Sequence, residues 1–568
     1  MMAPSFPPRR LWLLAAALLS ACAAGDSVDR PALRGAAPEV TGAFGSYLAG
    51  RFATNEADTK FAADSLLQAL RRDPNEPEIV QRAFIATLLD GRSEAARLAR
   101  VIPNEPLAAM YLAGQDAQAG RYERAEQRFR ALPRQGLSAV LQPLLVAWAQ
   151  HGRGQTDAAL ATLRPLTESG RQRGIYALHA AMIADIADRP REAERLVRIA
   201  LADSATPSLP LTRTMAGILM RAGQTAEAER LLDRLGRGHD DAGLFAETGG
   251  RDAVATRRVV ASATEGMAES YLALATALRG PQAGEFSLAL VRLAMQLRPR
   301  YGPALLAGAD ALSDEGQYAA ALALLEPGDP ADPFAPVLAL RRAGLLDRLD
   351  KLPEAEAELR RLSSQFPRAF QPMARLGDLY RGRQNWPPAI TAYDAAIGRI
   401  GMPSMVHWPL FYARGIALER AKRWPEAEAD FQRALSLNPE QPLVLNYLAY
   451  SWVELGQNLV EARRMLERAV ELRPNDGNIA DSLGWALYKL GDIPGAVRWL
   501  EKAVELESQS SVINDHLGDA YWAQGRRREA LFQWRRALML GPEGDEGPKI
   551  EAKIANGLAP QPAAETRR

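Results

Sequence analysis

Histidine and cysteine are the side chains of this 568-residue sequence best suited to bind a metal or act as a nucleophile. No histidine has a second histidine at a metal-ligand spacing, and the HExxH, GxSxG, GxxxxGKS/T and GxGxxG patterns are absent. We therefore predict no catalytic site, no metal and no cofactor. The five histidines are His151, His179, His239, His407 and His516.

Two histidines stand beside carboxylates. His239 is followed by Asp240 and Asp241, which could hold a metal or exchange a proton, although a solvated loop is the simpler interpretation. His516 follows Asp515 on an expected helix, where the pair suits a binding contact better than catalysis.

Cys22 is the only cysteine, and it closes a typical secretory leader. Two arginines precede the apolar stretch 11–19, and small residues follow it, as in a signal peptide. The stretch is shorter than the roughly 20 residues of a spanning helix. Residues 1–21 are therefore predicted to be removed.

The four residues from Leu19 to Cys22, LSAC, resemble the lipobox of bacterial lipoproteins. This resemblance implies that the thiol of Cys22 carries a lipid, and that residues 22–40 form a lipidated linker. Ala23, where such lipoproteins carry aspartate for inner-membrane retention, implies the periplasmic face of the outer membrane. Ordinary secretion with cleavage after Ala21 or Ala23 is the alternative.

The charge of the chain is balanced. Its 69 lysines and arginines nearly cancel 68 aspartates and glutamates, leaving a formal net charge of +1. This balance gives no electrostatic reason to expect nucleic acid as a partner. One cysteine also excludes a disulfide framework, so helix packing must hold a chain that is too long for one ordinary core.

A 34-residue repeat decides the fold class. The segments 481–506 and 515–540 place small residues at matching positions. The pairs, each 34 positions apart, are Gly484 with Gly518, Gly491 with Gly525, Ala496 with Ala530 and Ala503 with Ala537. This is the tetratricopeptide period, and it predicts an all-α superhelical solenoid of about a dozen helical hairpins.

The repeat pattern also predicts the organisation of the chain. Its phase is lost in the glycine-rich stretch 236–261, which is the best candidate for a break. The predicted regions are a signal peptide (1–21), a lipidated linker (22–40), an N-terminal array (41–235), an irregular break or hinge (236–261), a C-terminal array (262–545), and a capping helix with a disordered tail (546–568).

The first helix of each hairpin should line the concave face of the solenoid, which suits the binding of a peptide. Its polar and aromatic stripe in the C-terminal repeats predicts a protein-binding groove, whereas Trp452, Leu483, Leu500 and Trp534 should be core. The alternative is that the groove residues only face solvent on the inner wall of the solenoid, or pack against neighbouring first helices. They are Asn446, Tyr450, Asn478, Asp481, Trp485, Tyr488, Lys489, Asp515, Asp519 and Trp522.

The lipobox, the repeats from about residue 41, the central break and the stretches LNYLAY and DSLGWALYKLG together resemble a group of proteobacterial outer-membrane lipoproteins. Some members tether periplasmic carboxyl-terminal processing proteases and bring cell-wall hydrolases to them. The resemblance implies a non-enzymatic, lipid-anchored adaptor for periplasmic proteins. The alternatives are an assembly factor for a pilus, secretin or polysaccharide exporter, and an enzyme with an unrecognised site.

Overall fold

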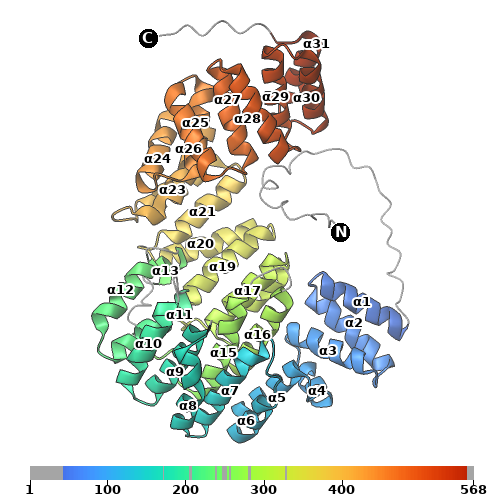
Figure 1. Cartoon of the computed structure of the whole chain (residues 1–568), viewed down its shortest axis with the longest axis vertical. Coiled ribbons are helices and arrows are strands. Elements are labelled where there is room, and N and C mark those ends of the chain that lie inside the picture. The colour runs from blue at the N-terminus through green and yellow to red at the C-terminus, as the bar shows by residue number, and fades with distance from the viewer. Residues whose placement is uncertain are drawn as a thin grey trace, which may run out of the picture. The chain divides into compact units, whose positions relative to one another are not determined.

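The chain folds into two compact units of helices (Figure 1). The computed structural model describes residues 42–170, 172–203, 208–236, 240–245, 253–254, 257–278, 283–326 and 329–558. The predicted signal peptide and lipidated linker, and the tail after residue 558, lie outside the described residues. The first unit ends at Gly382 and the second begins at Arg383.

The first unit opens with helical hairpins made from consecutive helices. Each odd-numbered helix up to α11 is the first helix of its hairpin and is followed by its antiparallel partner. They are α1 (Ala43–Asn55), α2 (Thr59–Arg72), α3 (Pro77–Leu89), α4 (Glu94–Val101), α5 (Pro106–Gln118), α6 (Tyr122–Arg130), α7 (Ser138–Gly152), α8 (Thr156–Glu168), α9 (Arg173–Ile186), α10 (Pro190–Asp203), α11 (Leu209–Arg221) and α12 (Thr225–Gly236).

The first unit continues through the predicted break. The helices here are α13 (Asp240–Phe245), α15 (Ala263–Ala277), α16 (Ala283–Leu297), α17 (Gly302–Asp314), α18 (Tyr318–Leu325), α19 (Ala335–Arg348), α20 (Leu352–Gln365) and α21 (Gln371–Gly382).

The second unit repeats the hairpin plan. Its elements are α22 (Trp386–Ile397), a 3₁₀ turn η2 (Met405–His407), α23 (Trp408–Arg420), α24 (Trp424–Leu437), α25 (Pro442–Leu455), α26 (Leu459–Leu472), α27 (Gly477–Lys489), α28 (Ile493–Leu506), α29 (Ser511–Ala523), α30 (Arg527–Met539) and α31 (Glu546–Asn556). Among the described residues, no helix combines the length and apolar content needed to span a membrane.

Glycine lets the two helices of a hairpin approach closely. A Cβ atom at Gly484 would lie 2.6 Å from Cγ of Leu500, and one at Gly518 would lie 2.4 Å from Cδ1 of Trp534. Both distances are shorter than real carbon contacts, so a larger residue would push the hairpin apart. The small positions that the 34-residue repeat singled out therefore have the packing role expected of them.

The ends of the helices are set by local side chains. Asp476 accepts hydrogen bonds from the backbone N–H groups of Asn478 and Ile479 at the start of α27. Ser510 caps α29 in the same way through the N–H of Ile513. Such caps accept hydrogen bonds from the first backbone N–H groups of a helix, which have no partner within it. They therefore fix the residue at which each of these helices begins.

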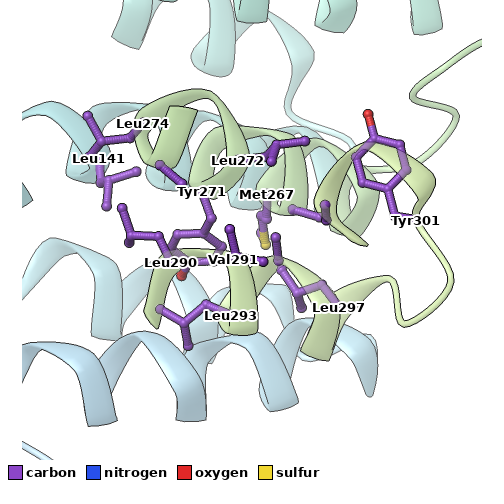
Figure 2. Close-up of a cluster of buried hydrophobic side chains, with 14 of the residues drawn as sticks. Leu141, Met267, Tyr271, Leu272, Leu274, Leu290, Val291, Leu293, Leu297 and Tyr301 are labelled. Atoms are coloured by element: carbon purple, nitrogen blue, oxygen red, sulfur yellow. The ribbon is translucent and has the colours of Figure 1, made fainter. Parts of the chain in front are cut away.

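The hairpin α15–α16 packs on the first helices of the N-terminal array. α15 contacts α5, α7 and α9, and α16 contacts α3 and α5. Figure 2 shows Leu141 of α7 beside side chains of α15 and α16 in one buried cluster. The labelled residues of these two helices are Met267, Tyr271, Leu272, Leu274, Leu290, Val291, Leu293 and Leu297.

Polar contacts join the same elements over long sequence separations. Arg292 Nε donates to the carbonyl of Leu89 at 2.7 Å, and Gln296 Nε2 donates to the carbonyl of Tyr111 at 3.0 Å. Helices on both sides of residues 236–261 thus share one core and belong to the first unit. The observed division of the chain lies at Gly382, and a role of 236–261 as a hinge stays a prediction.

Candidate functional site

The ten residues of the predicted groove all lie on α25, α27 and α29. These are first helices of successive hairpins, and α27 contacts both α25 and α29 in addition to its own partner α28. The three helices therefore run side by side along one face of the second unit. We call this the inner face.

Trp485 is the centre of the inner face, where it packs rather than standing open to solvent. It is 8% exposed. Its ring stacks on His516 of α29, with centroids 4.0 Å apart and an interplanar angle of 11°, and on Tyr488, at 4.9 Å and 8°. Its Nε1 donates to Glu454 of α25 at 2.6 Å. Trp485 thus ties three first helices together, as in the packing alternative of the sequence analysis.

His516 forms a buried ion pair beside this stack. Its Nδ1 lies 3.0 Å from Oδ1 of Asp481, and both side chains are nearly inaccessible. Burial alone would lower the pKa of His516, but the carboxylates of Asp481, Asp515 and Asp519 outweigh it and raise the pKa. His516 therefore favours its protonated form, which donates to Asp481.

Helix α31, the last helix among the described residues, covers one end of the inner face. Lys553 of α31 donates to Asp515 at 2.7 Å and to Asp519 at 2.9 Å. Burial and the charge of Asp515 raise the pKa of Asp519, although Lys553 opposes the shift. Trp522 Nε1 donates to the carbonyl of Leu558 at 3.1 Å. In this structure Asp515, Asp519 and Trp522 hold α31 and do not line an open groove.

The accessible part of the predicted groove is smaller. Asn478 and Lys489 on α27 are exposed, and Asn446 and Tyr450 on α25 are half-buried. Oδ1 of Asn446 is buried and has no hydrogen-bond partner. Burial raises the pKa of Tyr450, so its hydroxyl stays neutral and can donate a hydrogen bond.

Glu454 belongs to the same surface and was missed by the sequence analysis. It follows Asn446 and Tyr450 at four-residue intervals along α25, and it is exposed. Extending that spacing by one turn would have found it. We define the inner stripe as Asn446, Tyr450, Glu454, Asn478 and Lys489. It offers amide groups and charges of both signs on one surface.

The predicted core residues are confirmed, since Trp452, Leu483, Leu500 and Trp534 are all buried. Trp534 also donates from Nε1 to Asp519 at 2.8 Å, which binds α30 to the first helix of its own hairpin.

The acid–base cluster at 239–241 is only partly described, because His239 lies outside the described residues. Asp241 pairs with Arg341 at 3.8 Å. Within the part of the chain that the structure describes, no group of three histidine, cysteine, aspartate or glutamate side chains is placed to hold a metal ion.

The second unit matches a known repeat family. Residues 408–441 and 457–511 each match a family model described as tetratricopeptide repeat. Together with the hairpin architecture, these matches confirm the predicted fold class, an all-α tetratricopeptide-repeat solenoid. Tetratricopeptide repeats are in general protein-interaction modules, so the matched repeats of the second unit indicate a protein-binding surface.

One curated relative and several solved structures are similar to the chain. A TPR repeat-containing protein of Pseudomonas aeruginosa, PA4667, is 30% identical over 89 residues. That alignment covers 16% of this chain and only 15% of the relative's length.

Among solved structures, a tetratricopeptide repeat protein from Parabacteroides merdae is 19% identical, with a TM-score of 0.35, over 44% of this chain and 98% of that one. YrrB, described as a TPR protein with an unusual peptide-binding site, is 20% identical, with a TM-score of 0.28, over 31% and 89%. The Cut9–Hcn1 complex is 14% identical, with a TM-score of 0.39, over 90% and 96%.

Proposed function

We propose that this tetratricopeptide-repeat protein is a non-enzymatic adaptor, anchored by lipid at Cys22 to the periplasmic face of the outer membrane. In this role it brings a carboxyl-terminal processing protease together with cell-wall hydrolase clients. The lipobox-like residues 19–22 support the anchor, and the repeats support protein binding.

The inner stripe is the observation that carries the protein-binding part of the proposal. Oδ1 of Asn446 is a buried acceptor without a partner, and such a group costs free energy until a donor reaches it. Asn478 and Lys489 stand exposed on the neighbouring first helix. An extended partner segment can supply backbone N–H groups to the amide oxygens and a carboxylate to Lys489.

The mechanism is an increase in effective concentration. Two proteins that are bound to the same membrane-anchored scaffold meet each other far more often than two freely diffusing proteins do. The chemistry remains that of the recruited enzymes, so the scaffold needs no catalytic group.

The test is a crosslinked pulldown from the native host with membrane fractionation. The full chain is compared with an Asn446→Ala/Lys489→Glu variant, and with Lys502→Glu on the second helix α28 as a charge-matched control. We expect a periplasmic protease and a cell-wall hydrolase with the full chain and the control, and their loss with the stripe variant. A Cys22→Ser variant should leave the outer-membrane fraction.

Other outcomes reject parts of the proposal. Recovery of a secretin, pilus or exporter subunit without any protease would favour an envelope assembly factor. Unchanged capture by the stripe variant would move the binding surface elsewhere. Unchanged membrane fractionation of Cys22→Ser would remove the lipid anchor.

A further inference from the structure

A cleft of about 800 Å³ opens within the first unit, between α9–α11 and α15–α17. Its volume falls in the range of about 300–1,000 Å³ that is usual for ligand sites. Apolar side chains of α9, α11 and α17 form part of its wall. These include Ile175, Leu178, Leu211, Met215 and Leu306.

The charge of this cleft is one-sided. Among the described residues, its lining includes five carboxyl groups and no lysine or arginine. The five are Asp203, Glu269, Asp310, Asp314 and Glu315. Asp203 and Asp310 are paired with Arg173 and Arg341, which do not line the cleft. Asp314 and Glu315 are exposed and make no ion pair with any described residue.

Asp310 lies among other acids of the cleft and its surroundings. Burial raises the pKa of Asp310, and the charges of Asp241 and Asp314 raise it further, although Arg341 opposes them. Asp314 contributes to this crowding of acids. Because Asp310 is already paired with Arg341, a cation entering the cleft has Asp314 and Glu315 as its free partners.

A second feature of the cleft, independent of the acids, is an unpartnered donor. His179 lines the cleft and is fully buried. Trp148 Nε1 donates to its Nδ1 at 3.0 Å, so Nδ1 is the acceptor and Nε2 carries the hydrogen. Burial lowers the pKa of His179 to about 3, so the ring is neutral. Its Nε2 has no hydrogen-bond partner.

We propose that the cleft binds an extended basic peptide segment with apolar residues beside an arginine or lysine. The cationic side chain lies between Asp314 and Glu315, the apolar residues lie on Ile175 and Leu306, and a carbonyl oxygen accepts from Nε2 of His179. The site uses only the first unit, so it is separate from the inner stripe and goes beyond the adaptor role proposed for that stripe.

The chemistry of the site fits this ligand better than a neutral one. An arginine meets two carboxylates in a partly apolar cleft, where charge-assisted hydrogen bonds are strong. A carbonyl group satisfies Nε2 of His179, a buried donor that the described residues leave without a partner. A small polyamine would share the cation but not the apolar contacts or the carbonyl.

The experiment is fluorescence anisotropy with the purified full-length protein and a labelled hexapeptide of alternating leucine and arginine. We expect saturable binding, at least tenfold weaker for Asp314→Asn/Glu315→Gln, which removes two charges and little volume. Ala307→Trp, which fills the cleft from α17, should weaken binding as much. The charge-matched control Asp73→Asn/Glu76→Gln, in the α2–α3 turn, should bind as the wild type does.

Three outcomes would overturn the proposal. Equal binding by all variants would show non-specific attraction, and equal binding of a leucine–glutamate hexapeptide would remove the role of charge. Spermidine binding at the cleft without peptide binding would identify a polyamine site. Peptide binding should survive Lys489→Glu in the inner stripe, so failure here and failure of the adaptor function are separable.

Discussion

His516 lies flat against Trp485, with ring centroids 4.0 Å apart and an interplanar angle of 11°, while its Nδ1 donates to Asp481. The contact joins α27 and α29, which are the first helices of consecutive hairpins. It shows that one face of the second unit is held together by a polar and aromatic cluster as well as by apolar packing.

Replacing His516 should destabilise the second unit. In His516→Gln, Asp481 stays buried but loses its charged partner, which costs about 3 kcal/mol for a buried pair. We expect a lower urea midpoint, followed by tryptophan fluorescence. The double variant His516→Gln/Asp481→Asn should recover part of the loss, because it removes the unpaired charge. If the double variant is destabilised as much as His516→Gln alone, the loss of stability comes from the lost stacking on Trp485 and not from the unpaired charge.

The contribution of His516 should depend on pH. Its pKa is raised in the folded protein above the ordinary value of 6.5, so the folded state binds the proton more tightly than the unfolded state. The added stability is therefore fully present below pH 6.5 and is lost as pH rises through the folded pKa. The difference in unfolding free energy between wild type and His516→Gln should shrink from pH 6 towards pH 9. A difference that stays constant would contradict the assignment.

The charged groups around His516 either raise its pKa or are already paired with another side chain. Asp481, Asp515 and Asp519 favour its protonation, and Lys553 is paired with two of these carboxylates. Glu454 is engaged by Trp485. Lys553→Met should therefore raise the pKa of His516 further, which its ring proton resonances would report in an NMR titration.

The last helix should undock when Gly557 is replaced. Gly557 has a φ of 71°, and a Cβ atom there would lie 1.9 Å from the ring of Trp522. Gly557→Val adds strain and a clash, so α31 should leave the inner face and expose Trp522. A red shift of tryptophan emission and faster proteolysis after residue 540 are the expected readouts. Gly544→Val in the preceding turn, where nothing lies within 4 Å, carries a similar φ without the clash and should leave emission unchanged.

Docking of α15 on α7 should depend on Gly266. A Cβ atom at this position would lie 2.2 Å from the ring of Trp148. We expect Gly266→Ala to lower the unfolding free energy of the first unit by about 1–3 kcal/mol through overpacking. Gly344→Ala on α19, which meets nothing within 4 Å, should instead stabilise by up to about 1 kcal/mol. Thermal unfolding of both variants compares them directly, and equal effects would argue against a tight α7–α15 contact.

The repeat and its packing logic were predictable from local patterns. Gly484 and Gly518 stand 34 residues apart because each must admit a large side chain from the second helix of its hairpin, Leu500 or Trp534. Contacts within a hairpin join residues close in sequence, so their spacing is visible in the chain. The same holds for caps such as Asp476 and Ser510, which act within three residues.

The role of Trp485 was not predictable in the same way. Helical spacing placed it correctly on the inner face, but its burial depends on His516 and Glu454, which belong to neighbouring first helices. The spacing of residues along one helix tells which of them lie on the same face of that helix. It does not state whether the next helix brings a side chain that covers it.

Amino-acid order was enough to establish the helical repeats, their small and large core positions, and the face on which the groove residues lie, because all of these follow from short-range periodicity. Tertiary folding determined that α15 and α16 fill the N-terminal array and that α31 covers Asp515, Asp519 and Trp522. Those contacts join elements up to 203 residues apart, as Arg292 and Leu89 do. Their free energy comes from burying complementary surfaces, and no local pattern records which two surfaces will meet.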